Sequence, residues 1–356
     1  MVKLNKPNSL LDRGIARRKF LAASGAVAIM PLAGPALAAG EELVVADYGG
    51  VTTEVSRRSF YQPFQAATGI KVVEATTTGF AQLKAMVLAG NVQWDIVSTE
   101  EQNMHIGGAT GLLEPIDYSV VKTEGFLPGA AQRYGVVKSY YSGNLAYNTA
   151  KFPSPPQSWA DFWDVNRFPG ARGMRNSPQE NVEFALMADG VAPDKLYPLD
   201  LDRAFKKLSQ VKPHVKVWWT SGAQSVQIIT DGVVVMTPTW NGRVEGARRN
   251  GVPMDLVWNQ GLLIGAPYVV PKGARNRAAA MRFIQFAMQP DRMADFAKDF
   301  YSGPGVPAAL SLVSPDVQRR LPTHPDNLKQ MARFNGEWYA EHGDALSKRW
   351  ETWISS

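Results

Sequence analysis

Short apolar strands that alternate with helices are the feature that most limits what this chain can fold into. After residue 40, Leu43–Ala46, Ile70–Glu74 and Trp94–Val97 have the apolar or alternating pattern of strands. Helical patterns separate them, the clearest being an amphipathic stretch over Phe80–Leu88. A strand–helix–strand order favours a mostly parallel sheet covered by helices on both faces, so the expected fold class is α/β.

A proline-rich segment, Lys151–Pro156, divides this pattern into two parts. Past it, further strands are expected over Val215–Trp218 and Val233–Met236. After the second of these strands the chain is expected to turn sharply at Asn241-Gly242 and to enter a helix from Arg243. The last part of the chain is mainly helical, so the sequence predicts two α/β units followed by helices.

The first 38 residues have the features of a cleavable export signal. A twin arginine, Arg17-Arg18, precedes an uncharged stretch rich in alanine and glycine, and Ala36-Leu37-Ala38 matches an A-x-A cleavage pattern. The twin arginine favours the Tat export pathway, and a Sec signal whose basic region contains two arginines is the alternative. We expect a signal peptide over 1–38, cleaved near Ala38, and a mature protein that is soluble in the periplasm.

The formal net charge of +6 is concentrated in this leader. Residues 1–38 contain six basic side chains and one acidic side chain, which leaves 32 basic against 31 acidic residues in the rest of the chain. A nearly neutral body has no basic stripe that would release counterions from a phosphate backbone. Nucleic acid is therefore not an expected partner.

The sequence offers no set of residues that requires catalysis or metal binding. It has no cysteine, no metalloprotease or hydrolase motif, and no glycine fingerprint for nucleotide phosphates. Tyr140 and Tyr141 are of the type that iron carriers use, but neighbouring strand residues point to opposite faces. The histidines are far apart in the chain: His105, His214, His324 and His342. We expect no enzyme activity, cofactor or metal, with a ferric-iron carrier and an exported hydrolase as the alternatives from other classes.

Aromatic and charged side chains stand where the predicted strands end. In open α/β sheets ligands bind at the carboxyl ends of strands, where rigid aromatic faces and a fixed charge can orient them. Such residues are Tyr48, Glu100, Glu101, Trp219, Trp240 and Arg243. The alternatives are that a single tryptophan belongs to the core, and that Arg243 is a solvated helix residue paired with Glu245 or Asp255.

Several segments resemble, in order and spacing, the periplasmic solute-binding proteins of ABC importers. The similarity is to the spermidine/putrescine-binding group and its amino-acid-binding relatives, and it spans nearly the whole chain after the leader. The segments that carry it are Phe64–Val72, Ser158–Trp163, Phe168–Gly170, Asp231–Gly242, Val257–Trp258 and Ala278–Pro290. The resemblance implies a two-lobed type II fold, in which each lobe is a mixed sheet flanked by helices and crossover strands form the hinge.

The same resemblance implies boundaries for the lobes. Lobe 1 is expected to cover 41–146 and 265–310, and lobe 2 to cover 149–262. The helices of 311–356 are expected to pack on lobe 2. Such a protein captures a ligand between its lobes and delivers it to a membrane permease.

Particular ligand-binding residues follow from the resemblance as well. Tyr48 matches the aromatic residue at the end of the first strand, Glu180 matches an acid of lobe 2, and Trp240 matches the tryptophan beneath the ligand. Asn176 lies just before that acid in the same loop. The full expected set is Tyr48, Glu100, Glu101, Asn176, Glu180, Trp219, Trp240 and Arg243.

Two departures from the polyamine-binding pattern affect the expected ligand. Gly49-Gly50 stand where those proteins have an acid, and Ile264–Ala266 stand where they have an aromatic residue and a second acid. A diamine needs a carboxylate at each end, and Arg243 would repel it. In the amino-acid-binding relatives the arginine of Trp-Asn-Gly-Arg can grip a carboxylate in bidentate fashion.

We therefore expect a monomeric substrate-binding component of an ABC importer. Its expected ligand is a small organic solute that is amino-acid-like or otherwise bears a carboxylate. A polyamine such as putrescine or spermidine is the alternative ligand. The expected partners are this ligand and the transmembrane permease.

Overall fold

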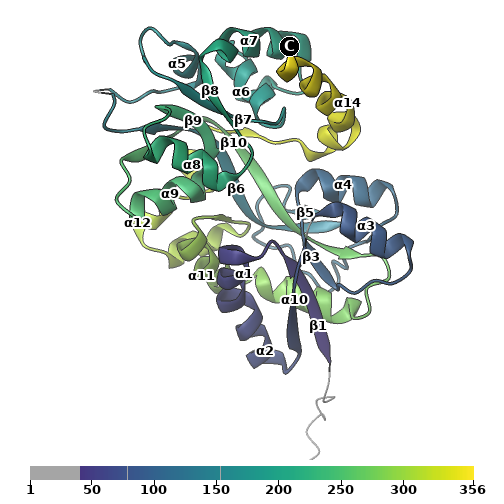
Figure 1. The fold of residues 1–356 in the computed structure, drawn as a ribbon. Coiled ribbons are helices and arrows are strands. Elements are labelled where there is room, and N and C mark those ends of the chain that lie inside the picture. Colours follow the sequence, from purple (N-terminus) through teal and green to yellow (C-terminus); the bar gives the residue numbers. More distant parts are fainter. Residues whose placement is uncertain (1–40, 78, 153) are drawn as a thin grey trace, which may run out of the picture. The chain divides into compact units, whose positions relative to one another are not determined.

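The computed structural model describes residues 41–77, 79–152 and 154–356. Figure 1 shows helices packed against both faces of a mixed sheet, which confirms the expected α/β class. The predicted signal peptide over 1–38 lies outside the described residues. Within the part of the chain that the structure describes, no helix is both long and apolar enough to cross a membrane.

Three parallel strands form one end of the sheet. They are β1 (Glu42–Asp47), β2 (Lys71–Thr76) and β3 (Ile96–Ser98), with β1 in the middle. The helices between and after them are α1 (Gly50–Ser56), a π-helical turn (Arg57–Tyr61), α2 (Gln62–Thr68), α3 (Phe80–Leu88) and α4 (Glu101–Ala109). Gly69 ends α2 with a φ of 74°, a left-handed conformation that costs glycine little. The predicted strands and the predicted helix over 80–88 are confirmed.

The other end of the sheet is also built from three strands. β7 (Arg172–Arg175) lies between β8 (Val215–Trp219) and β9 (Met236–Trp240), parallel to both. Their helices are α5 (Trp159–Trp163), α6 (Asn181–Ala188), α7 (Leu201–Val211), α8 (Gly222–Thr230) and α9 (Asn241–Arg249). Ser221 caps α8, because its hydroxyl accepts a hydrogen bond from the backbone of Gln224.

Two long antiparallel strands connect the ends of the sheet. β6 (Gly135–Asn148) and β10 (Met254–Pro271) pair along most of their length, and the strand order is β2-β1-β3-β10-β6-β9-β7-β8. β9 pairs antiparallel with β6, so Trp240 lies opposite Gly143. The carboxyl ends of β1, β3, β7 and β9 are therefore brought together around the middle of β6 (Figure 1).

The strand before Trp240 differs from the prediction. The sequence predicts a strand over Val233–Met236, whereas β9 starts at Met236 and includes Thr237 to Trp240. Val233 and Val234 both donate backbone hydrogen bonds to the carbonyl of Ile228, so they belong to the turn that ends α8. The predicted sharp turn after the strand is also wrong, because α9 starts directly at Asn241.

The remaining elements complete the chain. They are the strands β4 (Leu113–Glu114), β5 (Ala131–Gln132), β11 (Gly303–Pro304) and β12 (Ala332–Arg333), the 3-10 turns Pro193–Lys195, Lys212–His214 and Pro307–Leu312, and the helices α10 (Arg277–Ala287), α11 (Pro290–Phe300), α12 (Pro315–Gln318), α13 (Pro325–Leu328) and α14 (Gly336–Ser355).

Two large apolar clusters stabilise the fold. The first packs β1 and β3 against α2, α10 and α11, with Phe60, Phe64 and Phe283 fully buried. The second packs α5, α6 and α7 around Trp159 and Phe184, whose rings stack at 3.9 Å between centroids. Burying such aromatic side chains contributes roughly 1.5–3 kcal/mol each.

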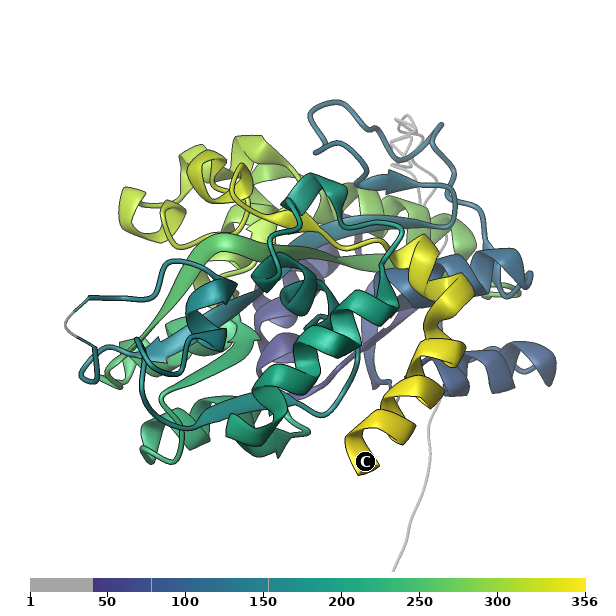
Figure 2. The same ribbon diagram turned by 90° about the horizontal axis from the view of Figure 1, so that it is seen from above.

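The C-terminal segment contributes to both clusters. Val313 and Leu321 pack in the first cluster. Trp338 and Trp350 of α14 pack in the second cluster. Figure 2 shows α14 (yellow) between the teal helices of that cluster and the blue helices of the first strands, and α14 contacts α4.

Candidate ligand-binding site

Side chains from four strand ends gather around Tyr141 in the middle of β6. Burial raises the pKa of Tyr141 well above its ordinary value, and the nearby carboxylates of Glu100 and Glu180 raise it further. The Tyr141 ring meets the Trp240 ring edge to face, with 6.3 Å between centroids. Tyr48 and Arg175 also lie close enough to act on this phenol electrostatically. Three residues predicted from strand ends, Tyr48, Glu100 and Trp240, therefore lie around Tyr141 together with Glu180.

Trp240 is held in place by Glu180. The indole Nε1 donates to both carboxylate oxygens of Glu180, at 3.1 and 3.2 Å. Arg175 forms an ion pair with the same carboxylate at 2.9 Å, and its guanidinium lies 5.3 Å from the Trp240 ring centroid. Burial raises the pKa of Glu180, and Arg175 opposes this effect. Both oxygens of this acid are thus already bonded to protein groups.

Glu180 adopts a backbone conformation that is rare for a residue with a side chain. Its φ is 73°, immediately before α6, and the surrounding contacts must offset this strain. Gly143 of β6 makes room for it, since a Cβ at position 143 would overlap Glu180 Oε2 and lie 3.1 Å from Phe184. Strain of this kind is characteristic of functional sites.

A cavity of about 320 Å³ opens between the ends of β1 and β3. Tyr48, which is 48% exposed, and Glu100 line it. Its other lining residues are Thr77, Gly79, Phe80, Leu83, Val97, Ser98, Thr99 and Asn103. A more open hollow of about 530 Å³ lies along β8, beside His214 and Lys216, but none of the predicted site residues reaches it.

Glu100 is a carboxylate without a cationic partner in hydrogen-bond contact. Gln102 donates to its Oε2 at 2.9 Å, and the described residues supply no ion pair. Burial raises the pKa of Glu100, and the charge of Arg175 opposes this effect. A partly desolvated carboxylate that lines a cavity is suited to bind a cationic group.

Ser98 lines the same cavity and is hydrogen-bonded to the buried Lys138. Lys138 Nζ donates to Ser98 Oγ at 3.0 Å and lies 3.9 Å from the carboxylate of Asp47. An ammonium group can only donate, so Ser98 must accept from it and keeps its own hydrogen for another acceptor. No protein acceptor within the described residues takes this hydrogen. Ser98 therefore keeps one hydrogen and one lone pair for a ligand in the cavity.

Arg243 lies on the first turn of α9 and is exposed. It forms no hydrogen bond or ion pair with the described residues, because Glu245 and Asp255 are bonded to Arg248 and Arg320 instead. Its side chain lies against Gly222 at the start of α8, where a Cβ would come within 3.0 Å of Arg243 Nε and 2.6 Å of the Trp240 ring. Arg243 is therefore an uncommitted cation beside Trp240.

The remaining predicted residues have other contacts. Trp219 is only 1% exposed, donates to Thr237 Oγ1 at 2.9 Å and packs edge to face against Trp240 at 5.7 Å, so it supports that ring from the core. Asn176 accepts a hydrogen bond from Trp350 Nε1 at 3.0 Å. Neither residue is among those that line the cavity.

Glu101 points away from its neighbour Glu100. It starts α4 and is buried against Gly265 and Gly336, where an added Cβ on either glycine would collide with it. Burial raises the pKa of Glu101 to about 7, and Arg333 opposes this effect. The structure thus separates these two acids, which the sequence treats as equivalent.

Two residues of the site were not predicted. Arg175 is the last residue of β7 and therefore satisfies the same strand-end rule as Trp240, but this short glycine-containing strand gives no clear apolar pattern. Tyr141 is one of two adjacent tyrosines, Tyr140 and Tyr141, and the sequence favours a packing role for both. Its role depends on the pairing of β6 with β9, which the sequence alone does not reveal.

In the described part of the chain, no group of three or more acidic or histidine side chains is placed to hold a metal ion.

Known proteins are similar to this chain in sequence and in fold. The chain matches the model of the bacterial extracellular solute-binding proteins over residues 59–323. It is 37% identical over 333 residues to the gamma-aminobutyric acid-binding protein of Pseudomonas aeruginosa, covering 92% of this chain and 94% of that one. It is 26% identical over 339 residues to the spermidine/putrescine-binding periplasmic protein of Escherichia coli, covering 89% and 94%.

A solved structure agrees with these relatives. The structure of a GABA receptor matches with a TM-score of 0.82 at 36% identity, covering 88% of this chain and 98% of that one. The predicted resemblance, the periplasmic-binding-protein fold and the non-enzymatic class are confirmed. The chain belongs to the bacterial extracellular solute-binding proteins and is the substrate-binding component of an ABC transporter.

Proposed function

We propose that this protein captures a small ω-amino acid, with an ammonium group at one end and a carboxylate at the other. The observation that carries this proposal is a pair of opposite charges, Glu100 and Arg243, for which the described residues supply no ion pair. A zwitterion of matching polarity would satisfy both charges. Gamma-aminobutyric acid is one such ligand, and the relative of 37% identity is named for it.

The ammonium end of the ligand is assigned to the cavity beside β1 and β3. Glu100 supplies the counter-charge there, and its raised pKa reflects the cost of keeping this carboxylate partly dry. The exposed Tyr48 ring can add a cation–π contact of about 0.5–1 kcal/mol. Binding an ammonium group would offset the desolvation of Glu100.

The carboxylate end is assigned to Arg243. A guanidinium offers a planar fork of donors, which fits a carboxylate in bidentate fashion. Arg243 lies on the first turn of α9, where the positive end of the helix dipole also favours an anion. The Trp240 ring beside it provides an apolar face for the carbon chain between the two charged groups.

A polyamine fits these groups less well. Its second ammonium group would need a second free carboxylate, and Glu180 already bonds to Arg175 and Trp240. Arg175 and Arg243 would also both repel it. The polyamine-binding relative shares only 26% identity, compared with 37% for the gamma-aminobutyric acid-binding protein.

We also propose the division into lobes that the resemblance implies. Lobe 1 would comprise 41–146 and 265–310 and lobe 2 would comprise 149–262, with the crossovers in β6 and β10. Gln179 donates to Gln102 at 3.2 Å, a contact that would join the two edges of the cleft. We propose export through the Tat pathway, cleavage near Ala38, and a monomer in the periplasm that delivers its ligand to the permease.

Calorimetry on the purified mature protein tests the proposed ligand. Gamma-aminobutyric acid is expected to bind with one-to-one stoichiometry, while putrescine and n-butyric acid bind far more weakly. Putrescine serves as the diamine of equal carbon number, and butyric acid lacks only the ammonium group. Tighter binding of putrescine would contradict the assignment of Arg243 and favour the polyamine alternative.

A further inference from the structure

Two sets of side chains lie on different sides of the helix α9. Trp240 and Arg243 are three residues apart at its start and face the candidate ligand site. Asn241, Glu245 and Arg248 form a separate stripe, because residues three and four apart lie on one side of a helix. Asn241 and Glu245 are almost completely buried, with 0% and 2% exposure. This stripe has no role in the proposed ligand contacts.

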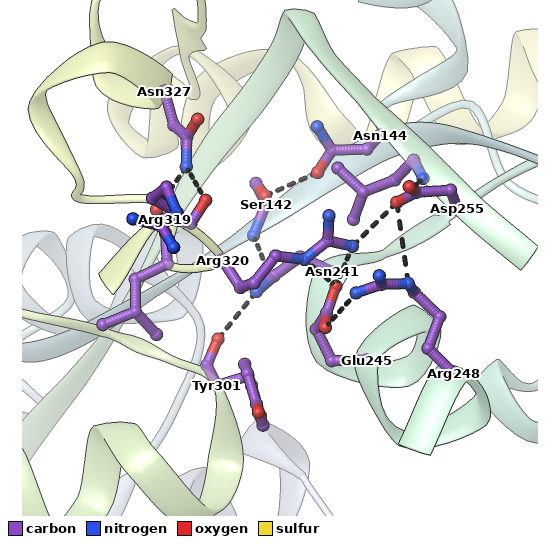
Figure 3. A network of polar contacts seen from close by, with 12 residues as sticks. Ser142, Asn144, Asn241, Glu245, Arg248, Asp255, Tyr301, Arg319, Arg320 and Asn327 are labelled. Carbon is purple, nitrogen blue, oxygen red and sulfur yellow. Dashed lines mark hydrogen bonds and ion pairs between the residues drawn. The ribbon is translucent and has the colours of Figure 1, made fainter. Parts of the chain in front are cut away.

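Asn241 joins three elements at the start of the stripe. Its Oδ1 accepts from the backbone N–H of Ser142 in β6 at 3.0 Å, and its Nδ2 donates to the carbonyl of Tyr301 at 2.7 Å (Figure 3). Tyr301 follows the last residue of α11 in a left-handed conformation with a φ of 53°. Its carbonyl lies at a helix end, where a partner from outside the helix is needed. Asn241 therefore ties α9 to β6 and to the end of α11.

Glu245 binds the other end of the stripe to the C-terminal segment. Arg320 donates to Glu245 through Nε at 2.7 Å and also through Nη2, and its Nη2 reaches Asp255 at 2.7 Å (Figure 3). Arg248, one turn further along α9, donates to Glu245 Oε2 at 3.0 Å. Two arginines and two acids thus alternate in one network that joins α9, β10 and residue 320.

The backbone that delivers Arg320 is itself held firmly. Asn327 donates at 2.9 Å to the carbonyls of both flanking residues, Arg319 and Leu321. Leu321 is fully buried in the first apolar cluster, together with residues of α10 and α11. Arg320 therefore projects from a fixed support that packs with the first cluster, while Glu245 belongs to the helix that carries Trp240 and Arg243.

We propose that Arg320 is a positioning residue of the ligand site, acting through Glu245 and the buried stripe of α9. It fixes the angle and depth of α9 and thereby sets where Trp240 and Arg243 meet the ligand. The inference rests on the proposed function only in taking those two residues as ligand contacts. Arg320 itself touches no ligand, so its loss weakens all ligands of the site by a common factor.

Substitution of Arg320 by methionine tests this role, with Arg319→Met as the matched control. Arg319 is the adjacent arginine, but it follows the last residue of α12 and pairs with the highly exposed Asp316 of that helix. We expect R320M to weaken the binding of gamma-aminobutyric acid about tenfold, the size of coupling that a buried network can carry, and R319M to leave it unchanged. Equal affinities of R320M and R319M, with R320M fully folded, would overturn the proposal.

A double variant separates positioning from simple destabilisation. R320M leaves the buried Glu245 with Arg248 as its remaining ionic partner among the described residues, and E245M in the same chain removes this buried charge and is expected to recover stability. Affinity is expected to stay weak in R320M/E245M, although its melting temperature returns toward that of the wild type. Recovery of wild-type affinity together with stability would show that Arg320 acts on folding alone and would overturn the proposal.

Hydrogen exchange gives a readout that needs no ligand. Amides of the first turn of α9 are expected to exchange faster in R320M and R320M/E245M than in R319M. If gamma-aminobutyric acid fails to bind the wild type while this difference in exchange is present, the proposed ligand is wrong and the positioning role stands. Unchanged exchange in α9 would overturn the role of Arg320 whatever the ligand is.

Discussion

Trp240 Nε1 shares its hydrogen between the two carboxylate oxygens of Glu180, at 3.1 and 3.2 Å, across 60 residues of sequence. This bond joins the end of β9 to the start of α6. It also explains why Glu180 tolerates a φ of 73°, since Arg175 and Trp240 together stabilise the carboxylate in that position. The aromatic wall of the site therefore depends on an acid that is not free to bind a ligand.

Gly143→Ala is expected to disturb this wall. An alanine Cβ would overlap Glu180 Oε2, so the carboxylate must move and the Trp240 hydrogen bond weakens. We expect a loss of about 1–3 kcal/mol in the free energy of unfolding and weaker ligand binding, measured by urea denaturation and calorimetry. Gly246→Ala is the control, because a Cβ at this position of α9 meets nothing within 4 Å and a helix favours alanine. Equal behaviour of the two variants would contradict the role of Gly143.

Glu183 is expected to make folding stability depend on pH. Burial raises its pKa to about 7, although the hydroxyls of Tyr197 and Tyr339 donate to it at 2.7 and 3.0 Å. A carboxyl whose folded pKa lies above its unfolded value binds more protons when folded. Its contribution to stability is therefore fully present below the unfolded value near 4.5 and is lost as pH rises toward 7.

Glu183→Gln tests this dependence. The wild type is expected to lose on the order of 3 kcal/mol of stability between pH 4.5 and 7.5 through this group, and E183Q to lose correspondingly less. Melting temperatures at these two pH values give the measurement. Glu101 has a pKa raised to about 7 by burial as well, so some slope remains in E183Q. An identical slope in both proteins would show that Glu183 does not titrate in this range.

Ser98→Ala and Lys138→Met are expected to have different effects. Ser98 lines the cavity and keeps one lone pair that Lys138 does not use, so it can accept from the ligand's ammonium group and S98A should weaken binding by about 0.5–1.5 kcal/mol. Lys138 is buried beside Asp47, so K138M should destabilise the fold by about 3–5 kcal/mol. K138M/D47N removes both charges and should recover part of this loss. Calorimetry and urea denaturation separate the two effects, and a strongly destabilised S98A would contradict the account.

Much of the fold could be predicted because its periodic elements are decided locally. The helix over Phe80–Leu88 and the capped start of α8 at Ser221 follow from apolar spacing and capping chemistry. The start of β9 could not be predicted, since Val233 and Val234 match a strand pattern but bond to Ile228 in the preceding turn. Competing backbone hydrogen bonds, which the sequence does not display, decided that boundary.

Residues of the candidate site could be predicted from the sequence only where they stand at the end of a predicted strand. Tyr48, Glu100 and Trp240 follow this rule. Glu101 does not, because α4 begins there and turns it into the interior beside Gly265. Tyr141 depends on which strand pairs with β6, a long-range property of the sheet.

The central claim is that Arg243 receives the carboxylate of an ω-amino acid. The most direct test is the dissociation constant of gamma-aminobutyric acid for Arg243→Gln, compared with Arg249→Gln as the control of equal charge on the same helix. We expect R243Q to weaken binding by about 1.5–3 kcal/mol, the worth of hydrogen bonds to a charged group, and R249Q to have little effect. Equal dissociation constants for R243Q and the wild type would contradict the account.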